Sequence, residues 1–170
     1  MCLWLQLDLS HNQLCGLYYD DDGELQGTYT AEGITAVANA LKVTPSLTSV
    51  SLANNMISGI GGEHADGSGE LRGTFSIEGI AAIAGALSKN TSLQSVDLSS
   101  NSLAGVNRSG HGTFHPEGIK AIAEALKVTA SLTKLDVQYN RLGEEGKAAL
   151  RKAVEGRSGF ELVVPSQSVP

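Results

Sequence analysis

The amino-acid sequence predicts an α/β fold of about four stacked units, each made of a strand, a turn, a helix and a loop, with long loop inserts. An asparagine follows each of four alternating apolar stretches, at Asn12, Asn55, Asn101 and Asn140. A Glu-Gly pair opens each helical segment, at residues 32–33, 78–79, 117–118 and 145–146. From the glycine of one helix to the next asparagine the distance is always 22 residues, as from Gly33 to Asn55. The variation in repeat length therefore falls between the asparagine and the following helix.

The length of 170 residues predicts one domain. We expect this domain to span residues 1–165, with residues 166–170 as a loose tail. Its repeats are expected at about 1–43, 44–89, 90–128 and 129–156, followed by a closing strand at 160–164.

Each strand is expected to bury alternate residues, followed by the asparagine. The aligned positions are Trp4-Leu7-Leu9-Asn12, Leu47-Val50-Leu52-Asn55, Leu93-Val96-Leu98-Asn101 and Leu132-Leu135-Val137-Asn140. Where the backbone turns out of a strand, an asparagine amide can bond neighbouring backbone groups. Stacking would line up these side chains in a structural ladder.

Each helix is expected to bury one face. The spacing of Ile34, Val37, Ala38 and Leu41 is one helical stripe, and it recurs from Ile80 and from Ile119. Thr30, Ser76 and His115 occupy the expected N-cap positions, and Pro116 suits the first turn. No unit can bury its stripe alone, so stacking must create the core.

The two ends of the array differ. In the last helix Lys147 and Arg151 replace apolar positions, which predicts a polar terminal edge. At the other end, Trp4, Leu7 and Leu9 would face a core that no earlier repeat covers. An exposed strand edge favours pairing with another chain, so this edge is a candidate for self-association or assembly.

Composition argues against several classes. A net charge of −6 disfavours general binding to nucleic acid or anionic membranes. No apolar run is long enough for a membrane span. The start MCLWLQLDLS lacks a basic region, and two cysteines make no disulfide framework. These features favour a cytoplasmic setting.

The shortest repeat, from Gly118 to Gly146, spans 28 residues. This 28-residue unit, the EGIxAIAxAL-type helices and the LxxLDLSxNxL strands resemble ribonuclease-inhibitor-type leucine-rich repeats over about residues 3–164. The resemblance implies a right-handed solenoid with a curved parallel sheet inside and helices on the convex side. It also implies a binding protein without catalytic residues. Family members include inhibitors, immune sensors and regulators of small GTPases.

The outward strand positions predict a polar, mildly acidic concave surface. One column contains Asp8, Ser51, Asp97 and Asp136, and the next contains Gln6, Ser49, Ser95 and Lys134. Beyond the strands lie His11, Asn54, Ser100 and Tyr139. This surface is a candidate for binding a basic or polar partner, although any solenoid needs a solvated face.

The inserts are more distinctive, because they repeat along with the array. Gly-Thr-aromatic recurs at 27–29, 73–75 and 112–114, so Tyr29, Phe75 and Phe114 are expected to pack inward and hold each insert. Tyr18 and Tyr19 have no counterparts in the other inserts, which makes them candidates for partner contact.

Metal binding and catalysis are not indicated. Calcium could be offered oxygen ligands by Asp20, Asp21, Asp22 and Glu24, or by Asp66 with Glu70. The run at 20–24 does not follow the EF-hand spacing, so a solvated acidic loop is the favoured interpretation. His111 and His115 lie four apart but in a glycine-rich loop without a nearby cysteine, so zinc is not expected. No nucleophile elbow or phosphate-binding loop is apparent, and no cofactor is expected.

The sequence thus predicts a non-catalytic protein–protein interaction module that binds through the concave sheet and the inserts. One alternative is a structural segment or subunit of a larger assembly that covers the open first strand. Another is an inhibitor or GTPase-activator-like regulator of an enzyme.

Overall fold

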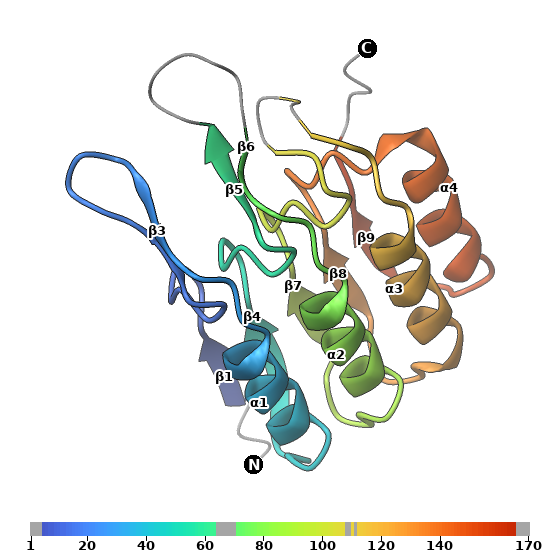
Figure 1. Ribbon diagram of the computed structural model, residues 1–170. Helices are drawn as coiled ribbons and strands as arrows, with labels where there is room; N and C mark the ends of the chain where they lie inside the picture. Colours follow the sequence, from blue (N-terminus) through green and yellow to red (C-terminus); the bar gives the residue numbers. More distant parts are fainter. Residues whose placement is uncertain (1–4, 64–70, 108–109, 111, 166–170) are drawn as a thin grey trace.

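The computed structural model describes residues 5–63, 71–107, 110 and 112–165. Five strands form one parallel sheet in the order β1 (Leu5–Asp8), β4 (Leu47–Ser51), β7 (Ser95–Asp97), β8 (Lys134–Asp136) and β9 (Glu161–Val163). Four helices cover one face of this sheet, α1 (Glu32–Leu41), α2 (Glu78–Leu87), α3 (Glu117–Val128) and α4 (Gly143–Ala153) (Figure 1). The predicted α/β repeat architecture is confirmed.

The core lies between the sheet and the helices. Val50, Val96 and Leu135 are paired across neighbouring strands and are buried at 1% exposure or less. Ile80 and Ile83 meet them from the helical side. Complete burial of a Leu or Ile side chain contributes roughly 1.5–3 kcal/mol, so the equivalent residues of neighbouring repeats stabilise one another.

The asparagine ladder is present and links each repeat to the one before it. The Asn101 amide nitrogen donates to the backbone oxygens of Leu52, Leu98 and Ser99 at 2.9–3.1 Å. Its oxygen accepts from the backbone N–H groups of Asn55 and Ile57. Asn55 and Asn140 bond in the same way and are completely buried. Asn12 is exposed, and among the described residues its side chain donates only to the Ser10 backbone oxygen.

The helices begin slightly later than the predicted caps. The N-cap positions are Ala31, Ile77 and Pro116, none of which forms a side-chain cap bond. The hydroxyls of Thr30 and Ser76 still accept the first helical N–H, each at 3.2 Å. His115 differs from them, because its ring stacks on Phe75 with ring centroids 4.2 Å apart.

The first two inserts are β-hairpins, which the sequence analysis missed. β2 (Leu17–Tyr19) pairs with β3 (Leu25–Gly27), and β5 (Ile60–Glu63) pairs with β6 (Leu71–Gly73). The third insert forms only a bridge between Val106 and Gly112. The hairpins project side by side from the edge where the helices begin (Figure 1). Strands of three or four residues rich in glycine carry too weak an alternation to be recognised from sequence.

Close approach of two backbone segments explains the glycines at the base of each hairpin, Gly27 and Gly73. Gly27 has φ +88°, and a Cβ there would lie 2.1 Å from the Gly16 oxygen. Gly73 has φ +87° and would place a Cβ 2.0 Å from the Gly59 oxygen. A side chain at either position would therefore separate the two strands of its hairpin.

The aromatic residue of each insert contacts a glycine of the next repeat. Tyr29 packs against the core, contacts Gly59 and donates from its hydroxyl to the Ile57 oxygen at 3.0 Å. Phe75 likewise contacts Gly105 and packs against the core. Inward packing is confirmed for these two rings. Phe114 contacts Gly143 but stays 37% exposed, because the last repeat carries no insert to cover it.

The terminal helix differs from the prediction at Lys147. Its side chain was expected on a polar edge, but it is buried at 4% exposure, with its ammonium 3.0 Å from the Glu144 carboxylate. Its aliphatic stem fills the place that Ile119 takes in α3, while the charged end reaches a carboxylate at the surface. Arg151 is exposed as predicted.

Candidate protein-interaction surface

Strand pairing brings the predicted concave columns together. The register aligns Asp8 with Ser51, Asp97, Asp136 and Val163. It aligns Gln6 with Ser49, Ser95, Lys134 and Glu161. The columns contain small polar and charged side chains, so the face offers hydrogen bonds and charge more than apolar contact.

The aspartates of the first column also have a structural role that sequence reasoning missed. Asp8, Asp97 and Asp136 each accept a hydrogen bond from the backbone N–H two residues later, at 2.9 Å. This contact turns the chain out of the strand, and an aspartate at a strand end is a recognisable sign of it. At Asp8 the bonds to Ser10 hold the carboxyl pKa below its usual value.

Negative charge accumulates toward the C-terminal strands. Burial raises the pKa of Asp136, and the carboxylates of Asp97 and Glu161 raise it further. Lys134 pairs with Glu161 at 2.7 Å, which raises the pKa of the lysine and places a carboxylate beside its charge. Lys134 is therefore a poor candidate for attracting an acidic partner.

We expect Asp136→Asn to raise the thermal midpoint at pH 7. The raised pKa means that the folded state binds the Asp136 proton more tightly than the unfolded state does. The ionised carboxylate therefore destabilises the fold above that pKa, and this penalty is absent below the unfolded value of about 3.9. The side-chain oxygen of the asparagine in this variant would still accept the hydrogen bond from the Gln138 backbone N–H. Calorimetry at pH 7 and pH 3 should show the gain only at pH 7.

Asp8→Asn is the matched control, because Asp8 makes the same turn with a lowered pKa. Asp8→Asn should lower the thermal midpoint at pH 7, which is the opposite of the effect expected for Asp136→Asn. An equal gain for Asp136→Asn at both pH values would contradict the electrostatic explanation.

A third column follows the ends of the strands. His11, Asn54, Ser100 and Tyr139 all have left-handed backbones with φ of 53–57°. The residues just after each ladder asparagine, such as Met56 and Ser102, are also left-handed. In the second repeat this turn directs the backbone N–H groups of Asn55 and Ile57 toward the side-chain oxygen of Asn101 in the next repeat. The left-handed backbone conformations therefore position the groups that form the hydrogen bonds of the asparagine ladder.

The third column and the hairpins enclose a groove of about 350 Å³. Its residues include His11, Tyr19, Asn54, Met56, Ser100 and Tyr139. The structure therefore brings four predicted candidates from the strand ends together with one from the first insert. Tyr18 does not line this groove.

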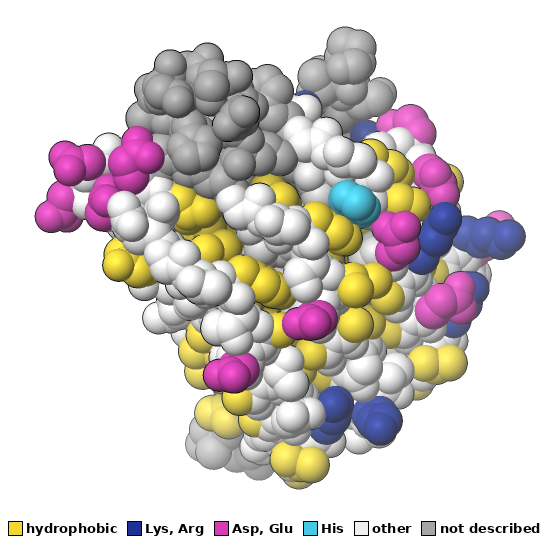
Figure 2. All heavy atoms as spheres, in the orientation of Figure 1, with side chains coloured by type: hydrophobic (Ala, Val, Ile, Leu, Met, Phe, Trp, Pro, Cys, Tyr) yellow, Lys and Arg dark blue, Asp and Glu magenta, His cyan; other side chains and the backbone are white. Residues whose placement is uncertain are grey.

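The first hairpin presents aromatic and acidic side chains. Tyr18 and Tyr19 are 42% and 45% exposed. The Asp20 carboxylate accepts bonds from the backbone N–H groups of Asp22 and Glu24 and from the Gln26 amide. It therefore organises the turn, and the acidic side chains gather at the hairpin end (Figure 2).

Among the described residues, the other titratable groups supply neither a metal-binding cluster nor a reactive thiol. In the described part of the chain, no group of three His, Cys, Asp or Glu residues could hold a metal ion. Asp66, Glu70 and His111 lie outside the described residues. Cys15 is completely buried, and burial raises the pKa of its thiol to about 12. That thiol is therefore protonated near neutral pH and weakly nucleophilic.

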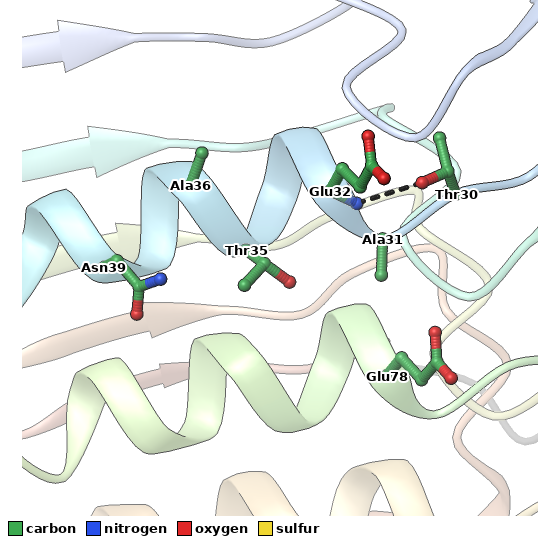
Figure 3. Close-up of a pocket in the computed structure, with 7 residues that line it drawn as sticks. All are labelled: Thr30, Ala31, Glu32, Thr35, Ala36, Asn39 and Glu78. Carbon is green, nitrogen blue, oxygen red and sulfur yellow. Dashed lines mark hydrogen bonds between the residues drawn. The ribbon is translucent and has the colours of Figure 1, made fainter.

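A second depression, of about 550 Å³, lies on the helical side and was not anticipated from the sequence. Figure 3 shows Ala31, Thr35 and Asn39 of the α1 region directed toward α2, with Glu78 at the start of α2. Its lining consists of alanine, threonine and asparagine side chains and two glutamates, Glu32 and Glu78. It lacks the aromatic residues typical of strong contact sites.

Comparison with known proteins supports the repeat architecture. A family model described as "Leucine Rich repeat" matches residues 89–106 and 130–150. No curated protein gives a significant sequence match to the chain. The chain resembles a solved structure of the tropomodulin C-terminal domain from Caenorhabditis elegans, with 13% identity and a TM-score of 0.62. That alignment covers 99% of this chain and 77% of the other.

Within the described residues, no helix combines the length and the apolar character needed to cross a membrane. The parallel sheet, the four helices on one face, the asparagine ladder and the matched repeats agree with one another. The chain therefore has an α/β fold of the leucine-rich-repeat type.

Proposed function

We propose that this chain is a non-catalytic protein–protein interaction module that binds its partner through the concave sheet and the inserts. Leucine-rich-repeat domains generally mediate protein–protein interaction, which gives the proposal its starting point. The observation that carries it is the projecting first hairpin. Its Tyr18 and Tyr19 side chains remain substantially exposed although the core is complete without them.

Exposed tyrosines on a braced element suit a binding role. Tyrosine supplies a large contact area and a hydroxyl, and it loses little conformational entropy on binding. The hairpin is held in place because the side chains of Leu25 and Tyr19 lie against Gly61 of the second hairpin. A partner would thus meet a supported wall beside the concave face.

The test is affinity capture from the native source, followed by binding measurements with Tyr18→Ser/Tyr19→Ser. We expect the double variant to weaken partner binding by about tenfold or more, as loss of aromatic contacts at an interface does. Its melting temperature should stay near that of the parent. A control, Val43→Ser, changes an exposed apolar residue beyond α1 and should leave binding unchanged. Full binding by the double variant would refute a role for the hairpin.

A second candidate is a structural role in a larger assembly, favoured by the edge strand β1. Leu5 and Leu7 are 49% and 40% exposed, and in the described residues no strand pairs with the outer edge of β1. Light scattering with size-exclusion chromatography tests self-association. A concentration-dependent dimer that Leu5→Ser/Leu7→Ser abolishes would support this role, whereas a monomer at high concentration would count against it.

The proposal extends to the residues that contact the partner, the type of repeat and the cellular setting. The partner surface includes Gln6, Asp8, Ser51, Asp97 and Asp136 beside the third column and the hairpin tyrosines. The ribonuclease-inhibitor type of repeat and a cytoplasmic setting agree with the repeat pattern and with a free, buried Cys15. A regulator of an enzyme remains the narrower form of this function.

A further inference from the structure

We propose that the groove between the third column and the first hairpin receives an arginine side chain from an extended segment of the partner protein. This inference rests on the proposed interaction function and names the chemistry that the partner must present. The groove volume of about 350 Å³ is at the lower end of the range of ligand pockets, roughly 300–1,000 Å³. It therefore suits one long side chain with its adjoining backbone.

The floor of the groove presents hydrogen-bond acceptors. The Asn54 amide nitrogen lies 2.7 Å from His11 Nδ1, so Asn54 donates there and its carbonyl oxygen is directed elsewhere. Within the described part of the chain, no group donates to that oxygen. Ser99 and Ser100, whose side chains carry hydroxyls, also line the groove. Carbonyl and hydroxyl oxygens complement a group that has only donors, such as a guanidinium.

Two phenol rings line the groove, one from the hairpin and one from the fourth repeat. Tyr19 is 45% exposed and Tyr139 is 53% exposed, so both leave ring surface for a ligand. A guanidinium stacks on aromatic faces through its planar, delocalised charge. Met56 and Ile60 add an apolar lining that suits the methylene stem.

The surrounding charge also favours a cation. Asp8, Asp97 and Asp136 form the neighbouring column, and Asp20, Asp21, Asp22 and Glu24 lie on the hairpin. Lys134 pairs with Glu161, and the guanidinium of Arg141 lies near Gly110 of the third insert and does not line the groove. An acidic segment would therefore be repelled, whereas a basic segment would be attracted.

Arginine is favoured over lysine by the shape of the site. Lysine carries a compact, strongly hydrated ammonium with three donors, and loses more hydration in a partly apolar groove. Guanidinium has five donors in one plane, and it can bond to the floor while its faces contact the rings. Charge alone would attract both residues. A difference in affinity between arginine and lysine would therefore report the shape and the lining of the groove.

The experiment uses the whole chain and three synthetic peptides, acetyl-Gly-Ser-Arg-Ser-Gly-amide and its lysine and citrulline counterparts. Citrulline keeps the shape of arginine and removes its charge. Binding is followed by nitrogen-15 chemical-shift titration at low salt. We expect the arginine peptide to bind about tenfold more tightly than the citrulline peptide and more tightly than the lysine peptide. The shifts should centre on Ser99, Ser100 and Tyr139.

Three variants locate the site. Tyr139→Ser should weaken arginine-peptide binding several-fold, and Ser100→Lys should block it by placing a cation in the groove without removing a ring. Val43→Ser is the control, because Val43 is exposed beyond α1 and does not line the groove, and it should bind the peptide normally. Unchanged spectra elsewhere confirm that each variant is folded.

Equal binding of all three peptides, or shifts confined to the hairpin end, would overturn the inference. If a captured partner binds Tyr139→Ser and Ser100→Lys with full affinity, the interaction function stands and the groove assignment fails.

Discussion

Replacing Asn101 with alanine is expected to lower the free energy of unfolding by about 3–5 kcal/mol. The side chain is completely buried and forms three donor and two acceptor bonds with the backbones of two repeats. Alanine would leave those backbone groups without partners in the interior, where each unsatisfied group costs about 1–3 kcal/mol. Urea unfolding followed by circular dichroism measures the loss.

Asn12→Ala is the matched control for this prediction. Asn12 occupies the same ladder position but is exposed, and within the described part of the chain its side chain makes one bond, to Ser10. Water replaces that partner, so the loss should stay below about 1 kcal/mol. Equal losses for the two variants would show that the turn conformation, and not burial of the amide, accounts for the ladder.

Replacing Gly27 with alanine is expected to open the first hairpin at a cost of about 2–4 kcal/mol. The residue has φ +88°, and its new Cβ would lie 2.1 Å from the backbone oxygen of Gly16. The strands must separate, because neither side of this contact is a flexible side chain. Hydrogen exchange should show lost protection in β2 and β3, while the amides of β7 and α3 remain protected.

Gly23→Ala tests whether the close approach matters beyond the backbone conformation. Gly23 has a similar φ of +77°, but a Cβ there would meet nothing within 4 Å. The expected cost is about 1–2 kcal/mol, from the left-handed backbone alone. If Gly27→Ala leaves hydrogen exchange in β2 and β3 unchanged, the close approach of Gly27 to Gly16 is not what holds the two strands together.

The inserts mark the limit of what local sequence patterns can predict. Their shared Gly-Thr-aromatic motif predicted that Tyr29 and Phe75 pack inward, and the structure places both rings against the core. The hairpins themselves were missed, since strands as short as Leu17–Tyr19 depend on a backbone contact between distant glycines. Such a contact has no local sequence pattern.

The candidate surface was predictable in part. Strand register follows from the repeat, so the columns through Asp97 and Asp136 could be derived before the structure. The groove could not, because it needs Tyr19 from the first insert beside Tyr139 from the fourth repeat. Residues 120 positions apart meet only when the stacking geometry and the hairpin direction are known.

The residue pattern predicts the repeat unit, the helices and the asparagine ladder, and the resemblance to leucine-rich repeats implies the parallel sheet with helices on one side. These features depend on periodicity, which local residue types encode directly. The tertiary structure alone decided where Lys147 lies, how the hairpins stand and which side chains share a groove. Those outcomes depend on contacts between repeats, where a long lysine stem can bury itself and where two glycine backbones can touch.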